Sequence, residues 1–122
     1  MARILVVDDA EFLRIVFRRN LESAGHEVTE AENGVEAIAA QNAQPFDLVI
    51  TDIVMPQKEG VETIIELRRA YPSLKIIAIS SGGPSRNPDY LKLAEQFGAD
   101  IVLSKPIPKD VLLEQVNACL SG

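Results

Sequence analysis

Apolar residues in this chain gather in short continuous runs, separated by longer stretches with helical spacing. Runs rich in Val, Ile and Leu occur at residues 3–7, 47–51, 75–79 and 100–103. Continuous apolar runs of this length are typical of strands that are buried on both faces of a parallel sheet. A weaker strand is predicted at 26–31, where Val28 alternates with polar neighbours as at the edge of a sheet.

Apolar residues three and four positions apart lie between these runs and predict helices. Five helices are predicted, over residues 10–24, from Asn33 towards Pro45, over 59–71, from Pro88 to Gly98, and from Pro108 onwards. Asn33 is a good N-cap, whereas Gly25 and Pro72 are residues that end helices. The first helix is expected to bury a face formed by Leu13, Val16, Phe17, Leu21 and Ala24.

Strand and helix therefore alternate strictly along a chain of 122 residues, which is enough for one domain with one core. This alternation implies an α/β fold with a parallel sheet and helices on both faces. Five strands favour a flavodoxin-like, doubly wound sheet with strand order 2-1-3-4-5 and five helices. Ligands of such sheets bind at the carboxyl ends of the strands, at the switch point between strands 1 and 3.

Composition removes several classes of function. A formal net charge of −6 argues against nucleic-acid binding, which needs clustered positive charge. Arg14, Arg18 and Arg19 are a local exception on the first helix, which we interpret as a solvated face. No apolar run could span a membrane and no signal peptide is apparent, so we expect a cytoplasmic protein. Cys119 cannot form an internal disulfide and is expected in the core, whereas His26 is expected at the surface.

Polar residues follow the predicted strands at the edge where ligands bind: Asp8 and Asp9, Asp52, Ser80 and Ser81, and Lys105. A helix cap would explain one aspartate, but not two beside a third. Crowded carboxylates repel one another, and a hard cation such as Mg²⁺ relieves that repulsion while keeping positions for water and a phosphate. Lys105 could bind an anion, and Ser80 offers a hydroxyl donor. Together these groups predict a phosphoryl-transfer site.

The motifs at these strand ends are similar to those of the receiver domains of bacterial two-component response regulators. The similar segments are Val6-Val7-Asp8-Asp9, Glu32-Asn33-Gly34-Val35-Glu36-Ala37, Asp47-Leu48-Val49-Ile50-Thr51-Asp52, Met55-Pro56, Gly60, Gly98-Ala99-Asp100 and Lys105-Pro106. The resemblance spans nearly the whole chain and implies one receiver domain over residues 1–122. It also implies a signalling switch that is controlled by phosphorylation.

The resemblance implies a role for each residue of the metal site. Asp52 is expected to be the phosphoacceptor. Asp9 and Asp52 are expected to bind Mg²⁺ directly, together with the backbone carbonyl of Val54. Asp8 is expected to hold the water shell of the metal.

The resemblance likewise implies which residues meet the phosphoryl group and respond to it. Ser80 and Lys105 are expected to contact its oxygens, and Ser81 to leave room for it. The Lys105–Pro106 bond is expected to be cis, a state that is cheap only before proline. Most similar receivers carry Tyr or Phe where this chain has Val102, which is short and stiff. We therefore expect the segment 81–90 to carry the switch.

Partners are implied in the same way. The phosphoryl donor is expected to be a histidine kinase or a histidine phosphotransfer protein, with no nucleic acid or membrane as partner. The downstream protein is expected to bind the face formed by helix 4, strand 5 and helix 5. No output domain is expected within this chain. Phe12 and Ile15 lie off the buried face of helix 1, and they either pack under a loop or form a docking patch for the kinase.

Three other functions agree less well with the residues present. An aspartyl-phosphate hydrolase would need an acid at position 54, where this chain has Val54. A flavin- or nucleotide-binding domain would need a phosphate cradle after strand 1, where Asp8 and Asp9 would repel the phosphate. A receiver that works without phosphorylation would be expected to lack Asp9, Asp52 or Lys105, and all of them are present.

Overall fold

A computed structural model of the chain describes residues 2–53, 59–80 and 95–121. Its strands are β1 (Arg3–Val7), β2 (Glu27–Ala31), β3 (Leu48–Asp52), β4 (Lys75–Ser80) and β5 (Ile101–Ser104). Its helices are α1 (Glu11–Ser23), α2 (Gly34–Ala43), α3 (Glu59–Ala70) and α5 (Lys109–Ser121). The helix expected from Pro88 to Gly98 lies mostly outside the described residues. Of its described part, residues 95–97 are helical.

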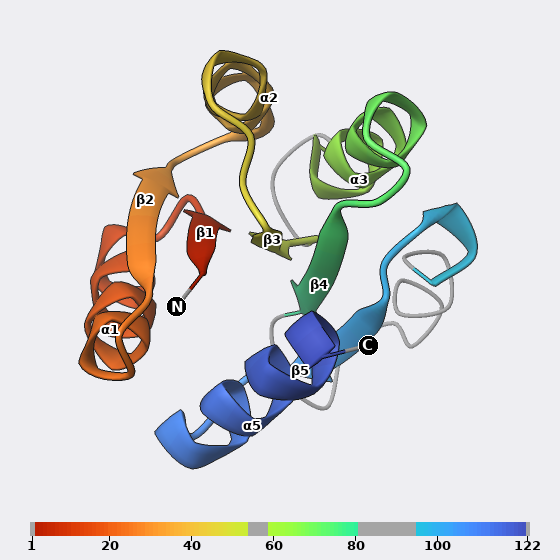
Figure 1. Ribbon diagram of the computed structural model, residues 1–122. Coiled ribbons are helices and arrows are strands. Elements are labelled where there is room, and N and C mark those ends of the chain that lie inside the picture. Colours follow the sequence, from red (N-terminus) through yellow and green to blue (C-terminus); the bar gives the residue numbers. More distant parts are fainter. Residues whose placement is uncertain (1, 54–58, 81–94, 122) are drawn as a thin grey trace.

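The strands form one parallel sheet in the order β2-β1-β3-β4-β5, as expected for a flavodoxin-like fold. Helices α1 and α5 cover one face of this sheet, and α2 and α3 cover the other (Figure 1). The alternating pattern around Val28 correctly predicted an edge strand, because β2 pairs with β1 alone among the described strands.

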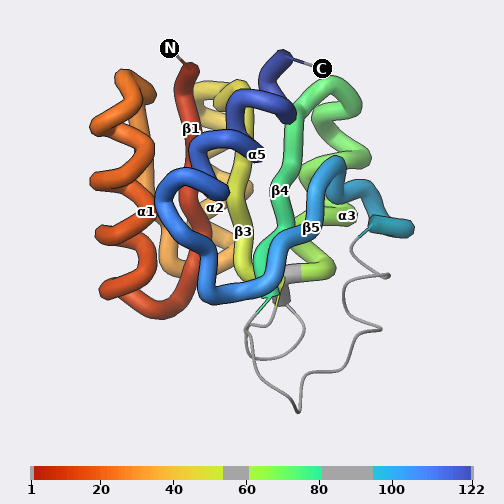
Figure 2. The backbone as a smooth tube through the Cα atoms, turned by 90° about the horizontal axis from the view of Figure 1, so that it is seen from below, coloured from red at the N-terminus to blue at the C-terminus, as the bar shows by residue number. Residues whose placement is uncertain are grey.

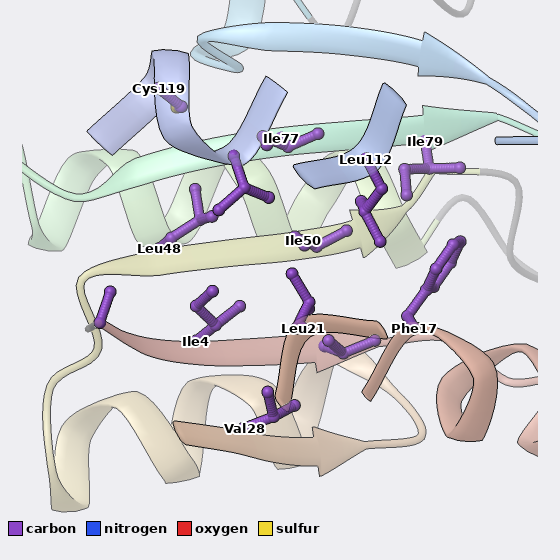
Figure 3. Packing of buried hydrophobic residues seen from close by; sticks show 13 residues of the cluster. Ile4, Phe17, Leu21, Val28, Leu48, Ile50, Ile77, Ile79, Leu112 and Cys119 are labelled. Atoms are coloured by element: carbon purple, nitrogen blue, oxygen red, sulfur yellow. The ribbon is translucent and has the colours of Figure 1, made fainter. Parts of the chain in front are cut away.

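The core consists of two apolar layers because successive strand residues point to opposite faces. In β1, Leu5 and Val7 belong to the layer under α2 and α3. Ile4 belongs to the other layer, where α1 contributes Phe17 and α5 contributes Leu112 (Figure 3). Cys119 is also buried in that layer, which confirms its expected core position.

Helix and strand boundaries differ from the predictions by one residue at several places. Helix α1 ends at Ser23, and Ala24 is an exposed C-cap, so its predicted burial is wrong. Strand β2 begins at Glu27 because the amide of His26 still donates to the carbonyl of Leu21. His26 lies at the surface as predicted, where it is half-buried. At α2, Asn33 caps the helix as predicted, since its Oδ1 accepts from the amide of Glu36 at 2.8 Å.

The amino and carboxyl ends of the parallel strands lie at opposite edges of the sheet. The first and last described residues lie together at one edge (Figure 2). The carboxyl ends of the strands, including Asp52, Ser80 and Ser104, lie at the opposite edge. Within the described residues, no helix combines the length and apolar character needed to cross a membrane.

Candidate functional site

Three aspartates meet at the carboxyl edge of the sheet, as the sequence predicted. Asp8 directly follows β1 and Asp52 ends β3, and the pairing of Val7 with Thr51 makes these strand ends neighbours. One carboxylate oxygen from each of Asp8, Asp9 and Asp52 lies within 4.8 Å of the others. Asp8 and Asp52 are buried, whereas Asp9 is exposed. The group therefore has one open side, through which a ligand could reach it.

Lys105 joins the two buried aspartates. Its Nζ lies 2.9 Å from Oδ2 of Asp8 and 2.8 Å from Oδ2 of Asp52. Burial lowers the pKa of Lys105, but hydrogen bonds and charges from Asp52 and Asp8 outweigh it, so the pKa lies above its usual value. The lysine is thus held as a cation between the two carboxylates.

Backbone contacts place Lys105 at this position. Its amide donates to the carbonyl oxygen of Ser80 at 2.8 Å, which continues the pairing of β4 with β5 beyond Ser104. The following Lys105–Pro106 bond is cis, as the sequence resemblance implied.

The hydroxyl group of Ser80 lacks a hydrogen-bond acceptor within the described part of the chain. The residue is fully buried, and its Oγ has no hydrogen-bond partner among the described residues. A buried hydroxyl without a partner is costly, so a ligand oxygen that accepted from it would be stabilised. Ser80 directly follows Ile79, the residue that pairs with Asp52 in the β3–β4 register, so such a ligand would lie near the carboxylates.

The remaining predicted residues contribute less to the described site. Val54 and Ser81 lie outside the described residues, as do 82–90 of the expected switch segment. Val102 is half-buried in β5 and packs against the apolar layer under α2 and α3. Phe12 is 75% exposed, so packing under a described loop does not explain it.

Arg14 contacts the backbone of the acidic group, which the sequence did not predict. Its Nη1 donates to the backbone carbonyl of Asp8 at 2.6 Å, and its Nε donates to Oε1 of Glu30 at 3.1 Å. Only 12% of its side chain is exposed. The predicted solvated face is therefore wrong for Arg14, while it holds for the exposed Arg19. The available signal was the position of Arg14 one helical turn after Ala10, near the aspartate pair.

The donors present are suited to a small hard cation. They are the carboxylate oxygens of the three aspartates, which leave room for further ligands on the exposed side of Asp9. Mg²⁺ prefers a few such ligands together with water and phosphate oxygens. The lysine and the unpartnered hydroxyl beside them are suited to an anion. The site can therefore accommodate a cation and an anionic group side by side.

Comparison with known proteins agrees with this geometry. Residues 4–117 match the model of the response regulator receiver domain. The chain belongs to this family. As a receiver domain of the family, it is a phosphoryl-accepting signalling switch.

Relatives of similar length support the assignment. The receiver domain is 36% identical to chemotaxis protein CheY of Bacillus subtilis and 35% identical to chemotaxis protein CheY of Halobacterium salinarum, each over 98% of both chains. A solved CheY-like receiver domain protein from Methanospirillum hungatei has a TM-score of 0.91 at 28% identity, covering 99% of this chain and 94% of its own.

Proposed function

We propose that Asp52 is the phosphoacceptor of this receiver domain and that Mg²⁺ bound by Asp9 and Asp52 supports the transfer. The donor is a phosphohistidine of a kinase or of a phosphotransfer protein. A carboxylate oxygen of Asp52 attacks phosphorus as the bond from phosphorus to the imidazole nitrogen breaks, and the imidazole leaves with the electron pair. The main support is the position of Asp52, buried between two further carboxylates and the ammonium group of Lys105.

The neighbouring side chains have separate roles in this reaction. Bound Mg²⁺ supplies positive charge to the transferring phosphoryl oxygens. Lys105 releases its contact with Asp52 and pairs with a phosphoryl oxygen, so one positive charge serves both states. Ser80 donates its hydroxyl to another phosphoryl oxygen and thereby gains the acceptor it lacks. Asp8 holds the water shell of the metal, and the carbonyl of Val54 completes the ligands.

The test uses a small phosphodonor, because this removes the unknown kinase from the experiment. With acetyl phosphate and Mg²⁺, intact-mass spectra should show the addition of one phosphoryl group. Asp52→Asn should abolish the addition because an amide oxygen is a poor nucleophile. Asp110→Asn, an exposed residue in the first turn of α5, is the matched control and should leave it intact. Undiminished phosphorylation of Asp52→Asn would assign the phosphoryl group to another residue.

The signal leaves the site through a change in protein contacts. Val102 cannot report a ring-sized movement, so the segment 81–90 responds to the new charge of about −1.5 to −2 on Asp52. The downstream partner binds the face that includes β5, α5 and the helix preceding Gly98. The exposed Phe12 and Ile15 of α1 form a docking patch for the kinase. All of these contacts are expected in the cytoplasm.

The receiver domain also removes its own phosphoryl group, and does so slowly. Water reaches a phosphoaspartate past the residues two beyond Asp52 and two beyond Ser80. These are Val54, whose side chain is apolar, and Gly82, which has no side chain, so neither can orient a water molecule. Loss of a labelled phosphoryl group from the protein within seconds at room temperature would contradict slow hydrolysis.

A further inference from the structure

Asp9 is the member of the acidic group whose position depends most on the backbone. Asp8 is held through its side chain by the amide of Ala10, 2.8 Å from Oδ1, and by Lys105, 2.9 Å from Oδ2. The exposed side chain of Asp9 makes no hydrogen bond to any residue that the structure describes. Its carboxylate stays near Asp52 only if the direction of the chain after Asp8 is fixed.

Arg14 fixes this direction through the backbone. Its Nη1 donates at 2.6 Å to the carbonyl oxygen of Asp8, which belongs to the peptide group that joins Asp8 to Asp9. A peptide group is planar, so holding its oxygen also orients the bond that leads to the Cα of Asp9. A charged donor makes this hydrogen bond stronger than one between neutral groups.

Glu30 of β2 in turn fixes Arg14. Its Oε1 accepts from Nε of Arg14 at 3.1 Å, and its Oε2 accepts from Nη1 of Arg18 at 3.0 Å. The side chains of Arg14 and Glu30 are only 12% and 22% exposed, so surrounding atoms limit their movement. A guanidinium group donates from two nitrogens in fixed directions at once, which an ammonium group cannot reproduce.

We infer that Arg14, oriented by Glu30, is a positioning residue that presents Asp9 to the divalent cation. The inference rests on the proposed function, because it requires that Asp9 is a metal ligand. Arg14 does not touch the cation, since a guanidinium group has only donors. It acts as the partners behind metal ligands do, whose loss weakens metal affinity roughly 10- to 100-fold.

The sign of the effect separates positioning from simple electrostatics. Removing a positive charge near three carboxylates should by itself strengthen cation binding, because it removes a repulsion. Loss of positioning predicts the opposite. Arg14→Gln should therefore bind Mg²⁺ roughly 10-fold more weakly than the wild type. Arg14→Lys keeps the positive charge but cannot donate from two nitrogens in fixed directions, so it should also bind Mg²⁺ more weakly.

The experiment measures the Mg²⁺ dissociation constant from amide chemical shifts in ¹⁵N-labelled protein. Arg19→Gln removes an exposed charge from the same helix and is the matched control, with unchanged or slightly tighter binding expected. Phosphorylation by acetyl phosphate gives a second measurement. Arg14→Gln should need more Mg²⁺ for half-maximal rate but approach the wild-type rate at saturating Mg²⁺.

Each other outcome overturns the inference. Unchanged or tighter Mg²⁺ binding by Arg14→Gln would exclude positioning, as would an equal weakening in Arg19→Gln. If Arg14→Gln does not fold, Arg14→Lys decides the question, because it keeps the positive charge and loses the two-nitrogen donor geometry: weaker Mg²⁺ binding supports the inference and unchanged binding rejects it. If the wild-type protein itself binds no Mg²⁺, the proposed metal site fails and the inference fails with it.

Discussion

Two clusters of charged side chains lie at opposite edges of the same sheet, and they differ in how well their charges are matched. At the amino edge of β4 and β5, Arg68 donates to the carbonyls of Pro72, Leu74 and Gly98 and to Oδ2 of Asp100 at 2.6–3.0 Å. Asp100 also accepts from the amide of Ile76 at 2.8 Å. At the carboxyl edge, one lysine pairs with two of the three grouped aspartates, and a buried serine hydroxyl has no partner among the described residues.

The two clusters differ in whether their polar groups already have partners within the described residues. The Arg68 cluster joins α3 to the chain entering β4 and β5, and its groups already have partners. The aspartate cluster has surplus negative charge and an unused donor, which a cation and an anion would satisfy. Mutations in the first cluster should therefore change stability, and mutations in the second should mainly change ligand binding.

The largest loss of stability is expected for Arg68→Ala. It leaves the carbonyls of Leu74 and Gly98 without their donor and Asp100 without its counter-charge. We expect the free energy of unfolding to fall by roughly 3 kcal/mol, while any folded protein still takes up a phosphoryl group. Urea denaturation measures the first effect and intact-mass spectra the second.

Arg69→Ala is the control, because Arg69 is the exposed neighbour of Arg68 in the same turn of α3. It should change stability little. A contrary result would be an Arg68→Ala protein that is as stable as the control, since the cluster would then contribute nothing to folding. Gly98 depends on the same contact: a Cβ there would lie 2.8 Å from Cγ of Arg68, and its φ of +126° favours glycine.

Substitutions of the neighbouring residues Asp8 and Asp9 should change the stability of the metal-free protein by smaller amounts and in opposite directions. Asp8→Ala removes the buried acceptor of Ala10 and Lys105 and should cost about 2 kcal/mol without metal. Asp9→Ala removes an exposed charge from a repulsive group, so the metal-free protein should be as stable as the wild type or more stable. Both variants should lose Mg²⁺ affinity. A large loss of metal-free stability in Asp9→Ala would make that residue a structural cap.

The contrast also explains what could be read from the sequence. Strand positions and the acidic edge follow from local apolar runs and from the topology that gathers strand ends, so Asp8, Asp52 and Lys105 were found. The contacts of Arg14 and Arg68 depend on where a long side chain meets backbone carbonyls 4 to 30 residues away. No periodicity in the sequence encodes such contacts. The hydrogen bond from the amide of Ala2 to His26 is likewise encoded by no local pattern, because the two residues are 24 positions apart.

The smallest expected effect is on the pH dependence of stability and concerns His26, which lies at the amino edge of the sheet. Its Nδ1 accepts from the amide of Ala2 at 3.1 Å, which requires the neutral imidazole. Burial and the positive charge of the amino terminus lower the pKa of His26 below 6.5. The unfolded chain therefore binds this proton more readily than the folded one. Its contribution to stability is present above pH 6.5 and is lost as the pH falls below that value.

Because His26 is the only histidine, its imidazole proton resonances report its pKa directly during an NMR titration. We expect a midpoint below that of an unfolded peptide containing the same residue. In urea denaturation at pH 7.5 and 5.5, His26→Asn should lose less stability on acidification than the wild type, since Asn can accept from Ala2 without titrating. Equal losses in the two proteins, or an NMR midpoint at or above the peptide value, would mean that the bond to Ala2 does not hold the imidazole neutral.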